Sequence, residues 1–235
     1  MKPFSIAIST LGILAILAPA PAGAQQFDLG PGLTKDEFKD FTAEVGSLLR
    51  FRQFGDAATL GRHRVDLSVQ FASTPVDDPA QAWNNNAIPG VVARFGVSER
   101  VDMGAWGRYD SRSNYGVAGV DTRIALLTEG PGRPVSVTIR PSIATLVGRS
   151  EVWAANASID LSVSRTVGHL SPYVGVATTG SVALERSTDL DLDPAFAERS
   201  LAYAGLTYRW RTLSVSAEVE KAAVVSYGLR IGTRF

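Results

Sequence analysis

Cysteine is absent from all 235 residues of this chain. The protein therefore forms no disulfide bond, and no lipid is attached through a cysteine side chain. An excess of either charge is also absent, because 23 basic residues balance 23 acidic ones. That balance argues against a nucleic-acid partner, which requires a basic surface. Beyond the first two dozen residues, no apolar run reaches the ~18 residues that indicate a membrane-spanning helix.

The first 24 residues have the three-part pattern of a secretory signal peptide. Lys2 supplies the positive start, 6–17 form a short apolar core, and 22–24 (Ala-Gly-Ala) are the small residues of a cleavage site. The core is too short for a membrane-spanning helix, which needs ~20 residues. We therefore expect 1–24 to be removed on export, and 25–63 to form an N-terminal leader with a helix or loop.

Residues 35–50 carry apolar side chains at helical spacing, with charged side chains on the other side. Thr34 and Glu37 have the spacing of a capping box at the start of a helix. We therefore predict an amphipathic helix over 35–50. The competing interpretation is a strand, because apolar residues also alternate over 45–51. The apolar residues at helical spacing are Phe38, Phe41, Val45, Leu48 and Leu49.

From residue 64 onward, apolar residues alternate with small, polar or charged ones, which predicts strands. Most runs exceed the ~5–6 residues of a typical globular strand and suit the ~9–11 residues that cross a bilayer. Short turns alternate with longer loops, chiefly 73–87 and 186–199, as in outer-membrane barrels. An even strand number, with both chain ends at the periplasmic side, favours ten strands over eleven. Twelve strands, with one not recognised in the sequence, are the alternative. The ten predicted strands are 64–71, 89–97, 101–109, 115–127, 135–147, 152–167, 172–185, 201–210, 213–219 and 225–235.

The final segment, 225–235, alternates clearly and ends in an aromatic residue. One face carries Tyr227, Leu229, Ile231 and Phe235. This segment resembles the C-terminal assembly signal of Gram-negative outer-membrane β-barrel proteins. The resemblance extends over about 64–235. It implies an antiparallel up-and-down barrel in the outer membrane, contact with membrane lipid, and insertion by the barrel-assembly machinery.

The other face of the predicted strands carries charges of both signs. They either line a narrow pore or neutralise one another in a closed lumen. A lumen of about ten strands is little wider than one that side chains fill, and the predicted helix is available as a plug. These observations favour a closed network. Its expected members are Arg64, Asp66, Arg94, Asp102, Arg108, Asp121, Arg123, Arg140, Asp160, Glu218, Glu220 and Arg230.

The residues of catalytic and metal sites are sparse. His63 and His169 are the two histidines, neither has an aspartate beside it, and no G-x-S-x-G motif occurs. Asp189, Asp191 and Asp193 lack the glycine and terminal glutamate of an EF-hand loop. We therefore expect no enzyme activity, no metal site and no cofactor.

The sequence thus predicts an all-β outer-membrane barrel of about ten strands over 64–235, preceded by a short helix. The expected function is a narrow channel for small solutes or a structural barrel, and oligomeric state is left open. The alternative is a soluble periplasmic lipocalin-like barrel that binds an apolar ligand. In that alternative the apolar face of each strand would point inward.

Overall fold

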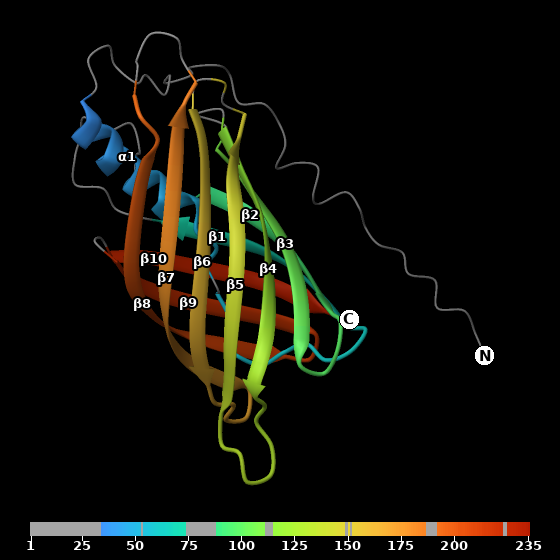
Figure 1. Ribbon diagram of the computed structural model, residues 1–235. Helices are drawn as coiled ribbons and strands as arrows, with labels where there is room; N and C mark the ends of the chain where they lie inside the picture. Colours follow the sequence, from blue (N-terminus) through green and yellow to red (C-terminus); the bar gives the residue numbers. More distant parts are fainter. Residues whose placement is uncertain are drawn as a thin grey trace, which may run out of the picture.

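The computed structural model describes residues 34–52, 54–73, 88–110, 115–148, 150, 152–186, 192–222 and 225–235. Within these ranges the chain forms ten antiparallel strands, which close into one barrel, and one helix (Figure 1). The predicted signal peptide and the loop 74–87 lie outside them. The elements are α1 (Lys35–Leu49), β1 (Val65–Ser73), β2 (Ile88–Gly96), β3 (Val101–Asp110), β4 (Tyr115–Leu127), β5 (Ser136–Val147), β6 (Val152–Ser164), β7 (Leu170–Glu185), β8 (Ala195–Trp210), β9 (Leu213–Lys221) and β10 (Val225–Arg234).

Strands that follow one another in the sequence pair with each other, and β10 pairs with β1 to close the ring. At this seam Val69 lies opposite Ile231, and Gln70 lies opposite Arg230. Closure leaves no free sheet edge, which is the condition for strands to cross a bilayer. The predicted ten-stranded up-and-down barrel is therefore confirmed, and the alternative of twelve strands is wrong for the described part of the chain.

The largest error in the predicted strands is the start of β8. The sequence indicated a loop through Arg199, whereas the strand begins at Ala195. Glu198 and Ser200 are exposed at the outward positions of this extension. Two of the three outward residues of this extension are therefore polar, with Phe196 as the exception, and the alternation that revealed the other strands is interrupted.

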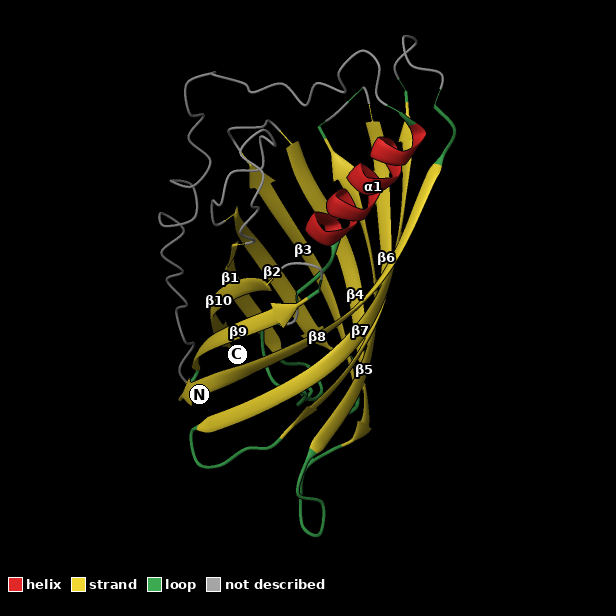
Figure 2. Cartoon of the chain, turned by 90° about the vertical axis from the view of Figure 1, so that its left-hand side faces the viewer, coloured by secondary structure: helices red, strands yellow, loops and turns green. Residues whose placement is uncertain are grey.

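α1 forms where helical spacing predicted it, and the strand interpretation of this segment is wrong. Its capping box is complete: the Thr34 hydroxyl accepts from the Glu37 backbone N–H, and the Glu37 carboxylate accepts from the Thr34 backbone N–H. The backbone N–H and then the hydroxyl of Thr34 hold the pKa of Glu37 below its ordinary value. Phe38, Val45 and Leu49 are buried, and the helix packs against β5 to β8 (Figure 2). No helix in the described residues is long and apolar enough to cross a membrane.

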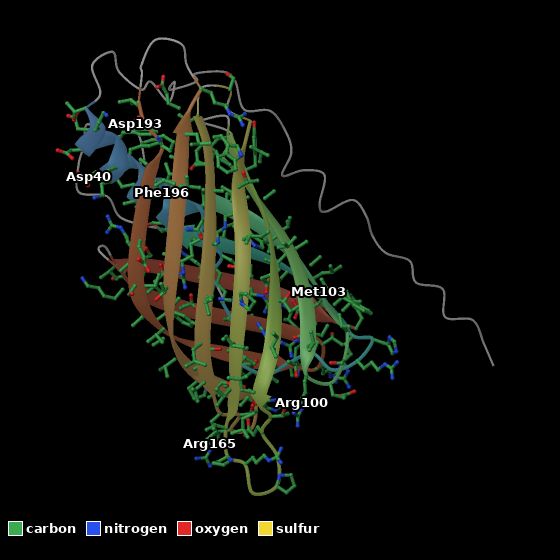
Figure 3. The ribbon with its side chains drawn as sticks, viewed as in Figure 1. Asp40, Arg100, Met103, Arg165, Asp193 and Phe196 are labelled. Atoms are coloured by element: carbon green, nitrogen blue, oxygen red, sulfur yellow. The ribbon has the colours of Figure 1, made fainter. Side chains whose placement is uncertain are left out.

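The two ends of the barrel differ. At one end, here called the turn end, short connections join β2 to β3, β4 to β5, β6 to β7 and β8 to β9. At the opposite end, here called the loop end, β1 and β7 end and β2 and β8 begin. Figure 3 shows Asp40 and Asp193 at the loop end, and Arg100 and Arg165 at the turn end.

The helix begins at the loop end, which the sequence did not predict. Lys35 Nζ lies 2.5 Å from Asp193 Oδ2 there, and Lys35 holds the pKa of this aspartate below its ordinary value through a hydrogen bond and its charge. Phe235 lies at the turn end, paired through its backbone with Val65. We expected both chain ends at the turn end. For the barrel wall the expectation holds, because β1 begins and β10 ends at the turn end, and the residues before Thr34 lie outside the described part of the chain.

After α1 the chain runs through the lumen to the turn end. Arg50 ends the helix, and its backbone N–H donates to Gly46. Further along, the Leu60 N–H donates to Asp102 at 3.1 Å, and the His63 N–H donates to the Gly96 carbonyl at 2.8 Å. Residues 35–62, here called the plug, therefore occupy the barrel from one end to the other.

Candidate functional site

Polarity in this barrel is reversed relative to a soluble protein. Large apolar side chains face outward on many strands: Ile143 is 61% exposed, Phe196 67%, and Met103 56%. Figure 3 shows Met103 and Phe196 on the outside of the wall. Charged side chains such as Asp160 and Arg140 are buried inside. This is the organisation of an outer-membrane barrel, and the lipocalin-like alternative, which needs the apolar face inside, is wrong.

The inner wall is hydrophilic over much of its height. Hydroxyl pairs bridge adjacent strands: Ser142 and Ser158 lie 2.7 Å apart, and Thr207 and Ser216 lie 2.9 Å apart. The amide of Asn156 donates to two more hydroxyls. These groups satisfy one another, as buried polar groups must. The same groups are suited to line a water-filled passage.

Most residues of the expected network are buried inside the barrel. Three ion pairs join strands of the wall: Arg94 of β2 reaches Asp121 of β4 across β3 at 2.8 Å, while Arg140 with Asp160, at 3.0 Å, and Arg230 with Asp66 join adjacent strands. Arg64 is different, because it precedes β1 and its side chain is exposed. The structure therefore leaves it outside the network that the sequence assigned to it.

Other expected members bind the plug or lie beside it. Asp102 accepts from a plug backbone N–H, and Arg123 donates to the Ala58 carbonyl at 2.8 Å. The guanidinium of Arg108 stacks on Trp106, 5.2 Å from the ring centroid. Glu218 and Glu220 are both buried on β9. The wall charges are therefore satisfied partly by one another and partly by the plug.

Sequence analysis missed the charged residues of the plug itself. Arg50 and Arg52 follow the helix, and Asp56 lies further along; all three are buried. Asp56 pairs with Arg209 of β8. One signal for a lumenal segment was available in the strands: near the loop end, inward positions such as Val117 and Leu146 are apolar too. A strand that is apolar on both faces has a second apolar surface against it, which here is α1.

Among these plug residues, Arg50 contacts two carboxylates and an aromatic ring. It is 1% exposed, and its guanidinium pairs with Glu220 through one terminal nitrogen and with Asp160 through the other, the latter at 2.9 Å. Its carbon Cζ lies 5.7 Å from the ring centroid of Tyr203. Glu218 stands on the same face of β9 as Glu220 and receives a hydrogen bond of 2.9 Å from Tyr173. We call Asp160, Tyr173, Tyr203, Glu218 and Glu220 the cage.

Two glycines make room for the tyrosines of the cage. Gly205 lies opposite Tyr173 across the strand pair, and Gly175 lies opposite Tyr203. A Cβ atom at either glycine would come within 2.3 Å of the facing ring. The rings therefore lie side by side at the wall, with their centroids 6.5 Å apart and their planes inclined by 61°, and form an aromatic side of the cage.

Plug and wall balance one another electrically. The plug contributes two arginines and one aspartate to the buried set, so the wall alone has five arginines and six carboxylates. Among the buried residues alone, the plug therefore offsets the single excess negative charge of the wall, while the partly exposed Arg209 and Arg234 of the wall also pair with Asp56 and Asp66. The buried charged residues are Arg50, Arg52, Arg94, Arg108, Arg123, Arg140 and Arg230, with Asp56, Asp66, Asp102, Asp121, Asp160, Glu218 and Glu220.

Little space remains beside the plug at mid-height. Phe51 and Phe54 face a polar cavity of about 20 Å³ that also borders Gln70 and Arg94. That is room for roughly one water molecule. This cavity is too small for an organic solute.

Comparison with known proteins finds solved structures that are similar to this chain at low sequence identity. No protein-family model matches the chain, and no curated protein matches it. Among solved structures, an outer-membrane channel from Pseudomonas putida F1 is 10% identical, covering 79% of this chain and 100% of that one at a TM-score of 0.49. The N-terminal β-barrel domain of Pseudomonas aeruginosa OprF is 12% identical, covering 74% and 99% at 0.37. Ail from Yersinia pestis is 13% identical, covering 74% and 99% at 0.32.

Proposed function

We propose that this outer-membrane barrel is a plugged channel for small hydrophilic solutes, closed at rest by its own N-terminal segment. The proposal rests on the polar contacts between the plug and the barrel wall. The plug contributes no strand to the barrel, and below α1 it is held by side-chain and backbone hydrogen bonds to a hydrophilic wall. The proposed role involves no chemical step and no enzyme activity.

The competing proposal is a structural barrel that never opens. A permanently closed core gains most from apolar packing, since replacing buried ion pairs by apolar residues is often neutral or stabilising. Below α1 the plug instead meets the wall through ion pairs and hydrogen bonds, such as Arg50 with Asp160 and the Ala57 N–H with the Ser164 hydroxyl. Water can replace such contacts one for one when a plug leaves. That exchange favours a removable plug.

Export and assembly are part of the same proposal. Residues 1–24 would be cleaved, 25–63 would carry the plug, and 64–235 would form the barrel. The barrel-assembly machinery would recognise β10, whose outward side chains Tyr227, Leu229 and Ile231 are exposed, as is the terminal Phe235. This exposure leaves the proposed signal accessible from the membrane side.

Single-channel recording in planar bilayers tests the channel. The full chain should show no resolvable conductance, and a variant lacking 35–60 should show discrete openings, because the remaining wall is hydrophilic. Heat-modifiable gel mobility must first show that the truncated barrel has assembled. An assembled variant that does not conduct would exclude a channel and leave the structural barrel.

A further inference from the structure

The cage is an acidic, aromatic pocket whose cationic partners come largely from outside the barrel wall. In the described residues, the cations that pair with Glu220 are Arg50 and Arg52, the latter at 3.9 Å, and both belong to the plug. Asp160 is shared between Arg50 and Arg140 of the wall. Removing the plug therefore leaves one arginine for these two carboxylates.

Glu218 adds a further acceptor to the pocket. Its Oε2 accepts from the Tyr173 hydroxyl at 2.9 Å and from the plug's Phe54 N–H at 3.1 Å. Its other oxygen, Oε1, is buried and has no hydrogen-bond partner in the part of the chain that the structure describes. A buried carboxylate oxygen without a donor is costly. The pocket therefore has more acceptor capacity than the docked plug uses.

We infer that the cage is a binding site for small organic cations, of the guanidinium or alkylammonium type, and that Arg50 occupies it as a tethered substitute. Carboxylates at two sides bind the N–H groups of a guanidinium in a paired geometry. The face of Tyr203 attracts the same cation through its ring quadrupole. Arg50 already makes both kinds of contact, so the structure displays the expected binding mode with a residue of the chain itself.

The inference rests on the proposed function, because a solute reaches the cage only when the plug leaves. It adds a substrate class to that function. With the plug displaced, Glu218 and Glu220 lie on one face of β9 without Arg50 and Arg52, the plug cations that now pair with Glu220. A passing cation would replace Arg50, whereas an anion would be repelled. Conversely, the docked plug competes with the solute for one site, which closes the barrel until the solute is abundant.

Chemical rescue in the full-length protein tests the site. Arg50→Ala removes the guanidinium and leaves a space of matching shape beside the two carboxylates. We expect ethylguanidinium, at about ten times its Kd, to raise the folded-to-unfolded ratio of this variant at its Tm by about tenfold, because it binds only the folded state. Where Arg50→Ala does not fold alone, refolding yield with and without the probe gives the same answer.

Three controls make the outcome decisive. Ethylurea has the same shape as ethylguanidinium but no charge, and it should not rescue. The wild-type protein, whose cage is filled, should not respond to either probe. Arg50→Ala combined with Glu220→Gln should lose most of the rescue. Equal rescue by ethylurea, or undiminished rescue without the Glu220 charge, would overturn the cation site.

These readouts do not depend on conduction, so they separate the two proposals. If the barrel never conducts but Arg50→Ala is rescued by ethylguanidinium, the proposed cation site is supported and the proposed channel is refuted. If the truncated barrel conducts without preferring cations and the full-length variant shows no rescue, the channel is supported and the cation site is refuted.

Discussion

Replacing Gly46 by alanine should loosen the plug, because the helix approaches the wall closely at this residue. A Cβ atom on Gly46 would lie 1.8 Å from Ser181 Oγ and 2.7 Å from Ser181 Cβ. The hydroxyl can rotate away, but the Cβ atom is fixed to the backbone of β7. The helix must therefore move away from the wall to accept the methyl group.

Two opposing effects set the magnitude. Alanine favours the helix over glycine by about 0.5–1 kcal/mol. Overpacking in a close-packed site costs about 1–3 kcal/mol. Overpacking wins, and the docked plug should lose up to about 2 kcal/mol, which is roughly a 30-fold rise in the undocked fraction. Adding Ser181→Gly to the same protein removes the side chain that the new methyl group meets, and this change should restore docking.

The undocked fraction can be read from thiol labelling, since the native chain has no competing cysteine. Val45→Cys places a thiol on the buried face of α1, at a position that is 2% exposed. Its labelling rate should follow how often the helix leaves the wall. We expect faster labelling with Gly46→Ala and a return toward the starting rate when Ser181→Gly is added.

Gly180→Ala is the matched control, because it makes the same change at the neighbouring wall position. A Cβ atom at Gly180 meets nothing within 4 Å, so labelling of Val45→Cys should be unaffected. The docking geometry would be refuted if Gly46→Ala and Gly180→Ala gave the same rate, or if Ser181→Gly did not reverse the effect of Gly46→Ala.

Three further predictions concern orientation, the outer face and pH. Long loops face the outside of the cell in such barrels, so Asp40→Cys at the loop end should react with an impermeant reagent on intact cells. Arg100→Cys at the turn end should react only after the outer membrane is opened. The reverse labelling pattern would mean that the barrel has the opposite orientation. Ile159→Arg, on the lipid face, should cost about 2–4 kcal/mol in a refolding titration, and a cost no larger than that of Ile159→Ala would contradict this assignment. Lys35 lowers the pKa of Asp193, so their contact should stabilise the protein at neutral pH, and this stabilisation should be lost as the pH falls through the lowered pKa. Lys35→Met should therefore shift the NMR titration midpoint of Asp193 upward. An unchanged midpoint would count against the ion pair.

The barrel could be predicted from the sequence because membrane strands obey a strict local rule. On β9, Ser214, Ser216 and Glu218 point inward and are buried, while Leu213 and Val219 point outward. Lipid on one side and a polar lumen on the other impose this alternation on each strand. Where the outer side is polar, as at Glu198 near the start of β8, the rule no longer applies and the strand start was missed.

The lumen could not be predicted with the same success because its contacts join distant parts of the chain. Arg50 meets Glu220 across 170 positions and Asp160 across 110. Such pairs leave no period in the sequence. The polar loop after the helix gave no local sign that Arg50, Arg52 and Asp56 would be buried. The path of the plug, which starts at the loop end, could not be predicted for the same reason.

Inward charges on strands are equally consistent with a pore and with a closed network, so alternation alone does not choose between them. The choice depends on where each charge finds its partner. Arg94 and Asp121 satisfy each other within the wall and would keep their contact in either state. Glu220 depends on Arg50 and Arg52 of the plug. The carboxylates that the wall does not neutralise by itself are therefore those that a moving plug would expose, and they mark the part of the lumen where selectivity would arise.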